Sequence, residues 1–384
     1  MINETSIKKT SLKEFVVICA LFSGLLFWIN LKISQILFCV VGILSFIGLL
    51  HEKKISKRLL PYIYIMFYMV LVSLNKDDIV RIVEWPVLIT VIAYIYNLGS
   101  LSKRIKRKII IILKIIGIVI ALPLSSNQSN WEGFYCGIFT NPDMLGYFEC
   151  LIYCIILIQT HEYYWNRKLN KAKLNLLYLC IPVVFSLLSQ ARMSIICIVI
   201  STIGLVFFEI LYLKRNCISD KRGRYKRIKH FTKIIFILFF IMSLLLILSG
   251  SLQGLIVKMT NVVADSERIN VHSSFISNAK LFGSSRKDFT TGTDSTFIYL
   301  LAYFGPIAAV WFYLLLLRTL RILIKSQLKG KLDFDGFYVI GAMGIFCLQS
   351  LTSDMFFTTA MFLAIIFNGI VMSECKVQLR IQEI

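Results

Sequence analysis

The sequence has few charged residues, and acidic residues are the scarcer kind. Charged side chains make up 16% of the chain and hydrophobic ones 57%, and 42 Lys and Arg stand against 21 Asp and Glu. This composition leaves no room for a soluble domain beside the apolar segments. We therefore expect a single integral membrane domain over residues 1–384. The net charge of +21 does not predict nucleic-acid binding, because the basic residues lie in short connections where anionic lipid head groups attract them.

The motifs of several common enzyme classes are also missing. The 4 histidines form no HExxH pattern, no two cysteines have CxxC spacing, and there is neither a GxxxxGKS/T phosphate loop nor a GxSxG elbow. The usual signatures of zinc proteases, ATPases and serine hydrolases are thereby excluded, and we expect neither a metal ion nor a cofactor. The 10 cysteines do not predict a disulfide framework, because only Cys136 falls in a predicted external segment.

What the chain does have is a series of apolar stretches near the length that crosses a bilayer. We predict an all-α fold, a polytopic transmembrane bundle of about 12 helical spans. The predicted spans are 14–30, 33–50, 59–74, 79–98, 109–124, 142–160, 174–189, 192–213, 234–250, 294–317, 337–352 and 355–373. At 189–192 and 353–354 the pattern also fits a bend within one long hairpin. Pro86, Pro182 and Pro306 fall within spans, where we expect kinks.

Lysine and arginine are concentrated in every second connection between these stretches. The connections at the N-terminal side of odd-numbered spans, with the C-terminal tail, hold 32 of the 42 basic residues. Short cytoplasmic loops retain positive charge, so the alternation predicts an orientation with both termini in the cytoplasm.

Two of the predicted external connections, 125–141 and 251–293, are longer than a turn. The second is the large late external loop, and a connection of that length is usually functional or disordered. Apolar residues recur in it near helical spacing after Asp265, and Gly283 is expected to end the helix. We predict a helix along the membrane surface, with Arg268 and His272 one turn apart on the same side.

A set of arginines and acids is predicted to face outward: Arg192, Arg268, Arg286, His272 and Asp294. Arginine here runs against the positive-inside trend, and its planar fork of donors suits the oxygens of a phosphate. The alternatives are structural. Arg192 would then anchor a helix end, Arg268 and Arg286 would be solvated loop charges, and Asp294 would be an N-cap.

Ionisable residues within the predicted spans form a second set of candidates. Arg81 and Glu84 lie three residues apart and can pair with each other, whereas Glu149 has no obvious local partner. Intramembrane charge is costly and usually faces a cavity or a partner. We predict that Arg81 and Glu149 bind substrate. The alternative for Arg81 is a structural pair with Glu84.

Three segments resemble the bacterial O-antigen and capsule polymerases and the related O-antigen ligases. Residues 137–146, GIFTNPDMLG, resemble the family's G-x-F-x-N-P-N-x-L segment, with Asp143 in place of Asn. Residues 189–194, SQARMS, resemble its S-x-S-R element, with Ala191 in place of the second Ser. Asp294-Ser295, followed by nine residues and then Gly305, is similar to the ligases' histidine motif, with Asp in place of His.

This resemblance implies a multi-pass glycosyltransferase of the bacterial cytoplasmic (inner) membrane, acting in polysaccharide biosynthesis. Its substrates would be polyprenyl-pyrophosphate-linked oligosaccharides, joined on the outer face without a metal ion. Arg192 would bind the donor's pyrophosphate, and Asp294 would occupy the position of the catalytic ligase histidine. Asp294, or else Glu149, would accept the proton of the attacking hydroxyl. Chain-length regulators and flippases are the partners that the resemblance implies, beside membrane lipid.

Two other functions fit the same pattern. One is a flippase or transporter of lipid-linked oligosaccharide, but transporters often show internal repeats, and nothing in the first half of the chain matches 251–293. The other is an O-antigen ligase, which the aspartate at position 294 disfavours.

Overall fold

The computed structural model of the chain is helical, apart from one very short hairpin. The structure describes residues 31–52, 60–74, 103–122, 130–131, 134–139, 142–215, 221–248, 262–284, 295–329 and 334–350, with the single positions Phe15, Val16, Cys19, Val87, Thr90, Val91 and Tyr94. The chain divides into two compact units, described separately: unit 1 is Met1–Lys106, Ser266–Ile322 and Ser350–Ile384, and unit 2 is Arg107–Asp265 and Leu323–Gln349.

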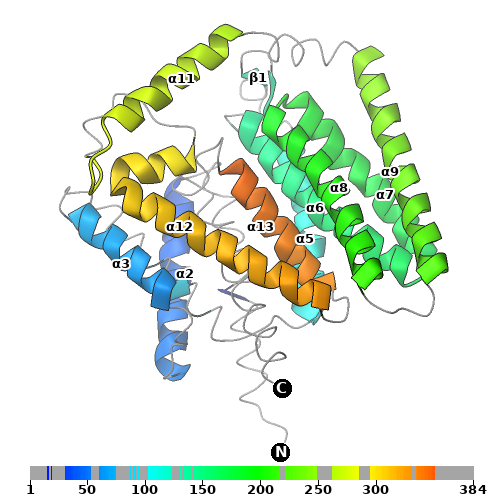
Figure 1. The fold of residues 1–384 in the computed structure, drawn as a ribbon, viewed down its shortest axis with the longest axis horizontal. Coiled ribbons are helices and arrows are strands. Elements are labelled where there is room, and N and C mark those ends of the chain that lie inside the picture. Colours follow the sequence, from blue (N-terminus) through cyan, green and yellow to red (C-terminus); the bar gives the residue numbers. More distant parts are fainter. Residues whose placement is uncertain are drawn as a thin grey trace, which may run out of the picture. The chain divides into compact units, whose positions relative to one another are not determined.

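The helices follow the predicted spans closely. They are α2 (Leu31–Glu52), α3 (Leu60–Leu74), α5 (Lys103–Ala121), α6 (Pro142–Trp165), α7 (Leu169–Leu188), α8 (Arg192–Arg215), α9 (Lys221–Leu248), α11 (Val262–Ser277), α12 (Thr296–Lys329) and α13 (Phe334–Gln349), and the hairpin joins β1 (Asn130–Trp131) to β2 (Phe134–Tyr135) (Figure 1). Every predicted span within the described ranges coincides with one of these helices, whereas most of 14–30 and 79–98, and all of 355–373, lie outside them.

The helical fold is confirmed and long apolar helices support a membrane protein, whereas the full span count stays a prediction. Four described helices are long and apolar enough to cross a membrane: Pro142–Trp165, Leu169–Leu188, Arg192–Lys214 and Phe297–Lys325. The joint at 189–192 is a true turn between α7 and α8. The chain termini lie outside the described residues, so their side of the membrane is untested.

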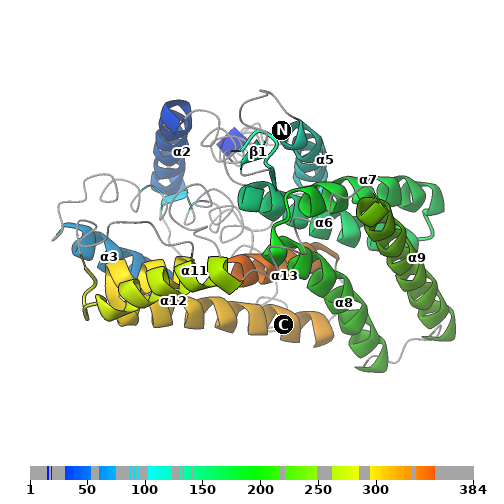
Figure 2. The same ribbon diagram turned by 90° about the horizontal axis from the view of Figure 1, so that it is seen from above.

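Unit 2 is built around α6. Every residue of this helix from Met144 to His161 is buried, as expected of a helix that is apolar on all sides. Helices α7, α8, α9 and α13 all pack against it, and Figures 1 and 2 both show α6 running beside α7 and α8. The outer helices keep apolar faces exposed, such as Phe236 and Phe240 of α9, which suits contact with lipid.

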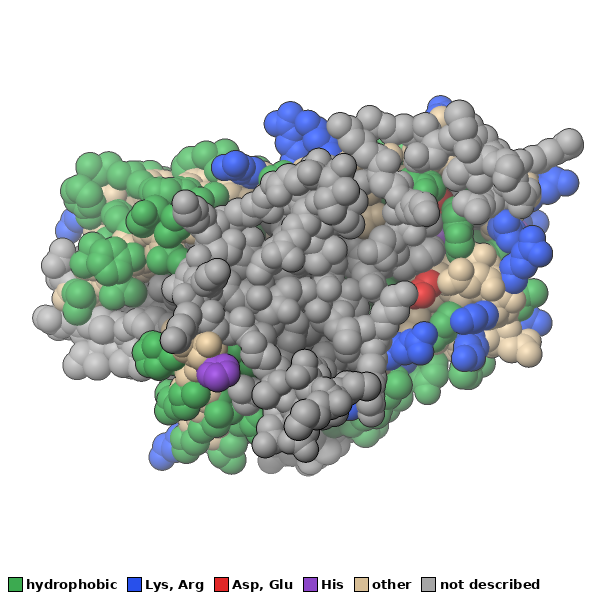
Figure 3. Space-filling model, turned by 90° about the horizontal axis from the view of Figure 1, so that it is seen from below, with side chains coloured by type: hydrophobic (Ala, Val, Ile, Leu, Met, Phe, Trp, Pro, Cys, Tyr) green, Lys and Arg blue, Asp and Glu red, His purple; other side chains and the backbone are tan. Residues whose placement is uncertain are grey.

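Basic side chains gather at one end of unit 2. Most of the exposed lysines and arginines of the unit lie at the start of α5, the α6–α7 turn, the end of α8 and the first half of α9; they are Arg107, Lys108, Arg167, Lys168, Lys171, Lys173, Lys214, Lys226, Lys229 and Lys233. Figure 3 looks onto this end from below and shows Lys and Arg side chains on unit 2. These residues belong to three predicted cytoplasmic connections, 99–108, 161–173 and 214–233. The three therefore share one end of the unit, which agrees with the alternation in the sequence.

Unit 1 contains α2, α3 and most of α12, and its described contacts centre on a bend. The kink predicted near Pro306 is present, because Gly305 leaves the helical conformation of α12 with φ of 84°. A Cβ on Gly305 would lie 2.0 Å from the carbonyl oxygen of Leu281, so only glycine fits there. Tyr68 of α3 donates a hydrogen bond to the Phe304 carbonyl at 3.0 Å. By contrast, α7 continues through Pro182 without a break.

The helix predicted in the late loop is present with different bounds. Helix α11 begins at Val262, before Asp265, and ends at Ser277 rather than at Gly283. Gly283 has φ of 74° and follows in a turn, where a Cβ would lie 2.1 Å from the carbonyl oxygen of Tyr303, so this position requires glycine. The predicted position of α11 on the membrane surface stays a prediction.

Candidate functional site

The α7–α8 turn carries the first predicted site residue, Arg192. Helix α7 ends at Leu188, and Gln190 adopts a positive φ of 54°. The Ser189 hydroxyl donates to the Ser186 carbonyl at 2.9 Å, and the Ser194 amide donates to Ala191 at 3.0 Å. These two hydrogen bonds stabilise the turn. Arg192 is the first residue of α8, and its side chain is half-buried.

The turn packs directly on the start of α6, through Gly146. A Cβ at this position would lie 2.4 Å from the Ala191 Cβ, 2.8 Å from the Ser194 hydroxyl and 2.9 Å from the Ser189 hydroxyl. No real side chain tolerates such distances, so the contact requires glycine. The segments 137–146 and 189–194, separate in the sequence, thus meet in the fold.

The first of these segments is held in place before α6 begins. Gly137 has φ of 60°, and a Cβ there would lie 2.2 Å from the Ile120 carbonyl oxygen, while the Ile138 amide donates to that same oxygen at 3.0 Å. Tyr135 donates to the Ala121 carbonyl. Partial burial raises the pKa of the Tyr135 phenol above its ordinary value, so it keeps its proton as a donor. The end of α5 therefore fixes the entry to α6.

A third helix reaches the same place through Gln349, a residue that the sequence did not single out. Its side-chain amide donates to the Ser194 hydroxyl at 3.2 Å and to the Cys150 sulfur at 3.7 Å, and the residue is 1% exposed. Gln349 ends α13, so this one side chain ties α13 to α8 and α6. A polar residue closing an apolar helix was the only signal available in the sequence.

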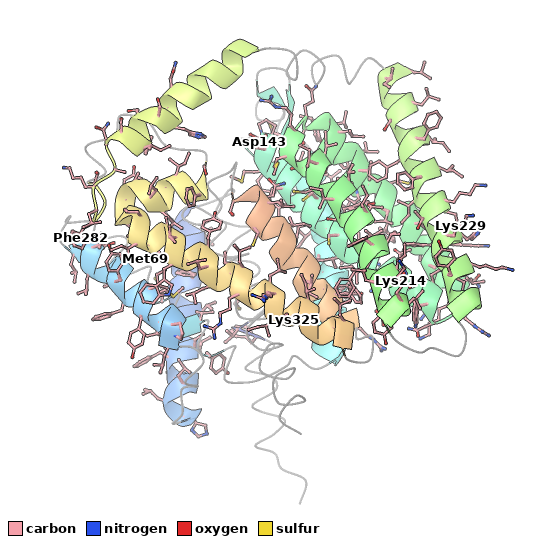
Figure 4. The ribbon with its side chains drawn as sticks, viewed as in Figure 1. Met69, Asp143, Lys214, Lys229, Phe282 and Lys325 are labelled. Carbon is pink, nitrogen blue, oxygen red and sulfur yellow. The ribbon has the colours of Figure 1, made fainter. Side chains whose placement is uncertain are left out.

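The local electrostatics favour an anion at this end of unit 2. Helices α6 and α8 both begin here, and helix N-termini carry partial positive charge and unpaired N–H groups. Pro142 stands at the first position of α6, where its missing N–H costs nothing. Arg192 adds a full positive charge, while Asp143, labelled in Figure 4, lies in the first turn of α6. Arg192 beside helix N-termini is an arrangement that can hold a phosphate-like group.

Glu149 lies three residues beyond Gly146 on α6. The residue is fully buried, and neither carboxylate oxygen has a hydrogen-bond partner among the described residues. On the side of α5, a Cβ on Gly117 would lie 3.7 Å from Oε2 of Glu149. The Ile152 side chain lies nearer still to that Cβ position, at 3.0 Å. The sequence prediction that Glu149 lacks a local partner is confirmed for the described part of the chain.

The other predicted residues belong to unit 1 or lie outside the described residues. Arg268 and His272 lie on α11, where the His272 side chain is half-buried and the Arg268 side chain is not described. Arg81, Arg286 and Asp294 lie outside the described residues. At the start of α12 the cap is formed by Ser295, whose hydroxyl accepts from the Ile298 amide at 3.5 Å.

Two polar clusters inside unit 2 were missed by sequence reasoning. Lys114 of α5 donates to Asn175 of α7 at 2.6 Å, and Asn175 donates to Gln159 of α6 at 3.0 Å. Towards the basic end, His161 and Glu209 approach to 2.5 Å, with side chains only 5% and 1% exposed. Glu209 of α8 is thus buried against a histidine of α6, and periodicity in the sequence cannot specify which helices pair in this way.

Within the described residues, no group of three or more His, Cys, Asp and Glu is arranged to hold a metal ion. Comparison with known proteins adds no relative: no protein-family model, no curated protein and no solved structure matches this chain.

Proposed function

We propose that the protein is a polysaccharide repeat-unit polymerase, a glycosyltransferase that joins polyprenyl-pyrophosphate-linked oligosaccharides at the outer face of the bacterial cytoplasmic membrane. The observation that carries the proposal is the contact at Gly146. It joins the two segments that resemble the O-antigen and capsule polymerases and presents Arg192 beside two helix N-termini.

The chemistry follows from the position of the positive charge. A hydroxyl of one repeat unit attacks the anomeric carbon of a chain held on a second lipid, and the bond from that carbon to the pyrophosphate breaks. The leaving pyrophosphate gains negative charge in the transition state. Arg192 and the amides at the start of α8 stabilise that charge, as preorganised donors do in many enzymes. A carboxylate accepts the hydroxyl proton.

The remaining sequence-predicted residues keep their proposed roles. Asp294 is a proton acceptor in this scheme, and Arg268, Arg286, His272 and Arg81 contact the glycan or its lipid phosphates. Guanidinium groups replace the divalent ion that many nucleotide-sugar enzymes use, so the reaction needs no metal or cofactor.

The purified protein tests the proposal. Incubated with synthetic lipid-pyrophosphate repeat units, it should give a ladder of products with one, two, three and more added units. The ladder should persist in excess chelator, because no metal takes part. Unextended substrate under conditions where the protein is folded would contradict a polymerase function.

A flippase is the second candidate, favoured by the ionisable groups buried inside unit 2. Such groups often line transport or proton pathways, and His161 with Glu209 and Lys114 with Asn175 are of this kind. Cells lacking the protein separate the two functions. Loss of a polymerase leaves single repeat units exported on lipid, whereas loss of a flippase leaves them on the cytoplasmic side.

A further inference from the structure

One lysine of unit 2, Lys114, lies inside a predicted span rather than at a helix end. It is seven residues after Arg107 on α5, so it lies two turns, about 10 Å, from the basic end of the unit. Its Nζ donates to Asn175 of α7 at 2.6 Å and lies 5.1 Å from the centre of the Tyr178 ring. In the described part of the chain no carboxylate forms an ion pair with it. An ammonium group has three donors, so α7 satisfies Lys114 only in part.

The surface around Lys114 suits contact with lipid. The Lys114 side chain is half-buried, so part of it reaches the outside of the unit. Exposed aliphatic side chains lie within one turn of it on α5 and next to Asn175 and Tyr178 on α7; they are Ile111, Ile115, Leu174 and Leu177. A positive charge among lipid-facing aliphatic groups is costly, and such charges usually have a partner or extend to the membrane interface.

Two further cations lie between Lys114 and the basic end, one on each helix. Arg107 shares a face of α5 with Lys114, because seven residues make almost two full turns. Lys171 shares a face of α7 with Asn175 and Tyr178, which follow it by four and seven residues. Arg107 and Lys171 are both exposed, and neither has a carboxylate partner among the described residues. We call Lys114, Arg107 and Lys171 the α5–α7 cation column.

We infer that the α5–α7 cation column binds the phosphate head group of an anionic phospholipid from the membrane leaflet at the basic end of unit 2. The phosphate oxygens accept hydrogen bonds from the Lys114 ammonium and complement the charges of Arg107 and Lys171. The acyl chains lie over the exposed aliphatic side chains of α5 and α7. A soluble anion would leave those side chains uncovered, which is why a lipid fits better. The site lies at the opposite end of the unit from Arg192 and is independent of the proposed reaction.

The test is a lipid-binding titration of the purified protein in a nonionic detergent. Fluorescent phosphatidylglycerol is the anionic probe, and phosphatidylcholine with the same label is the neutral comparison. The wild-type protein should bind phosphatidylglycerol more tightly. Lys114→Gln should weaken that binding by about fivefold or more, because it removes the charge and keeps a donor for Asn175. Lys114→Arg keeps the charge and should retain the preference for phosphatidylglycerol.

The matched control is Lys173→Gln. Lys173 is exposed near the same end of α7, but it follows Lys171 by two residues and so lies on another side of the helix. Its loss should leave lipid binding nearly unchanged. Equal weakening by Lys114→Gln and Lys173→Gln would overturn the site in favour of diffuse surface charge, as would equal wild-type affinity for the two lipids. Thermal unfolding checks that each variant is folded. Should Lys114→Gln not fold, Arg107→Gln at an exposed position takes its place, and wild-type lipid affinity in that variant would equally overturn the site.

Discussion

At the residue scale, glycine and buried charge determine where the candidate site forms. Gly146 allows the α7–α8 turn to sit on α6, and Gly137 allows the preceding segment to meet the end of α5. Neither role can be predicted from the sequence. A glycine in an apolar segment usually indicates lower helix stability, and nothing in the sequence shows that another segment packs closely against it. The family resemblance includes glycine at both ends of the segment 137–146, and the close packing at each position explains why glycine is required.

Alanine at position 146 should disturb the site from within. Its Cβ would overlap Ala191 and the two serine hydroxyls, so Gly146→Ala should lower the free energy of unfolding by about 1–3 kcal/mol and displace Arg192. Thermal unfolding in detergent, together with ladder formation, measures both effects. Gly204→Ala is the matched control on α8, because nothing lies within 4 Å of its Cβ position, and it should be neutral or slightly stabilising. Equal behaviour of the two variants would refute the packing role of Gly146.

The buried His161–Glu209 pair makes a second residue-scale prediction. Removing one partner leaves the other buried without compensation, so Glu209→Leu should lower the free energy of unfolding by about 3–5 kcal/mol. The double variant His161→Leu with Glu209→Leu should recover much of that loss, since neither charge remains. A double variant as unstable as the sum of the two single variants would show that the two side chains do not interact.

At the scale of elements, hydrophobic length located the helices well. Every predicted span in the described ranges is a helix, and the bend at Pro306 is found at the adjoining Gly305. Helix ends in the polar segments were less predictable, as α11 shows, because several residues there can begin or end a helix. The pairing of helices was not predictable at all. Apolar patterns say which face is buried, but not that Gln349 of α13 meets Ser194 of α8.

The bridge made by Gln349 is testable at this scale. Gln349→Met keeps the volume and removes the donor, so it should lower the free energy of unfolding by about 1 kcal/mol and reduce polymerisation by loosening α8. Ile203→Val is a control within α8, because the Ile203 side chain is exposed and the change should be close to neutral. Thermal unfolding of both variants in one detergent gives the comparison. If the Gln349→Met protein were as stable and active as the control, the hydrogen bonds of Gln349 would have no role in holding the site.

At the scale of the whole molecule, charge distribution predicts which face of the membrane holds the site. In unit 2, Asp143 marks the end where α6 and α8 begin, and Lys214 and Lys229 mark the ends with the basic residues (Figure 4). The positive-inside rule assigns the basic end to the cytoplasm. The site around Arg192 then opens to the outer face, where lipid-linked oligosaccharide is expected and nucleotide sugars are absent.

Labelling of single cysteines in intact cells tests this orientation. In a background without the native cysteines, Asp143→Cys should react with a membrane-impermeant thiol reagent added outside. Lys214→Cys and Lys229→Cys should react only after the cells are opened. The reverse labelling pattern would place Asp143 and the site on the cytoplasmic face. It would contradict the proposal that the site uses a lipid-linked donor at the outer face.

The most direct measurement of the central claim is the ladder of products made by purified Arg192→Lys beside wild type and Arg107→Lys. Lysine keeps the charge and loses the paired donors that suit a pyrophosphate, whereas Arg107 is exposed at the start of α5 and serves as the control. We predict a full ladder from wild type and Arg107→Lys and a rate at least 10-fold lower, on the order of one lost charge-assisted hydrogen bond, from a folded Arg192→Lys protein. A wild-type ladder from Arg192→Lys would contradict the role of this arginine in holding the leaving pyrophosphate.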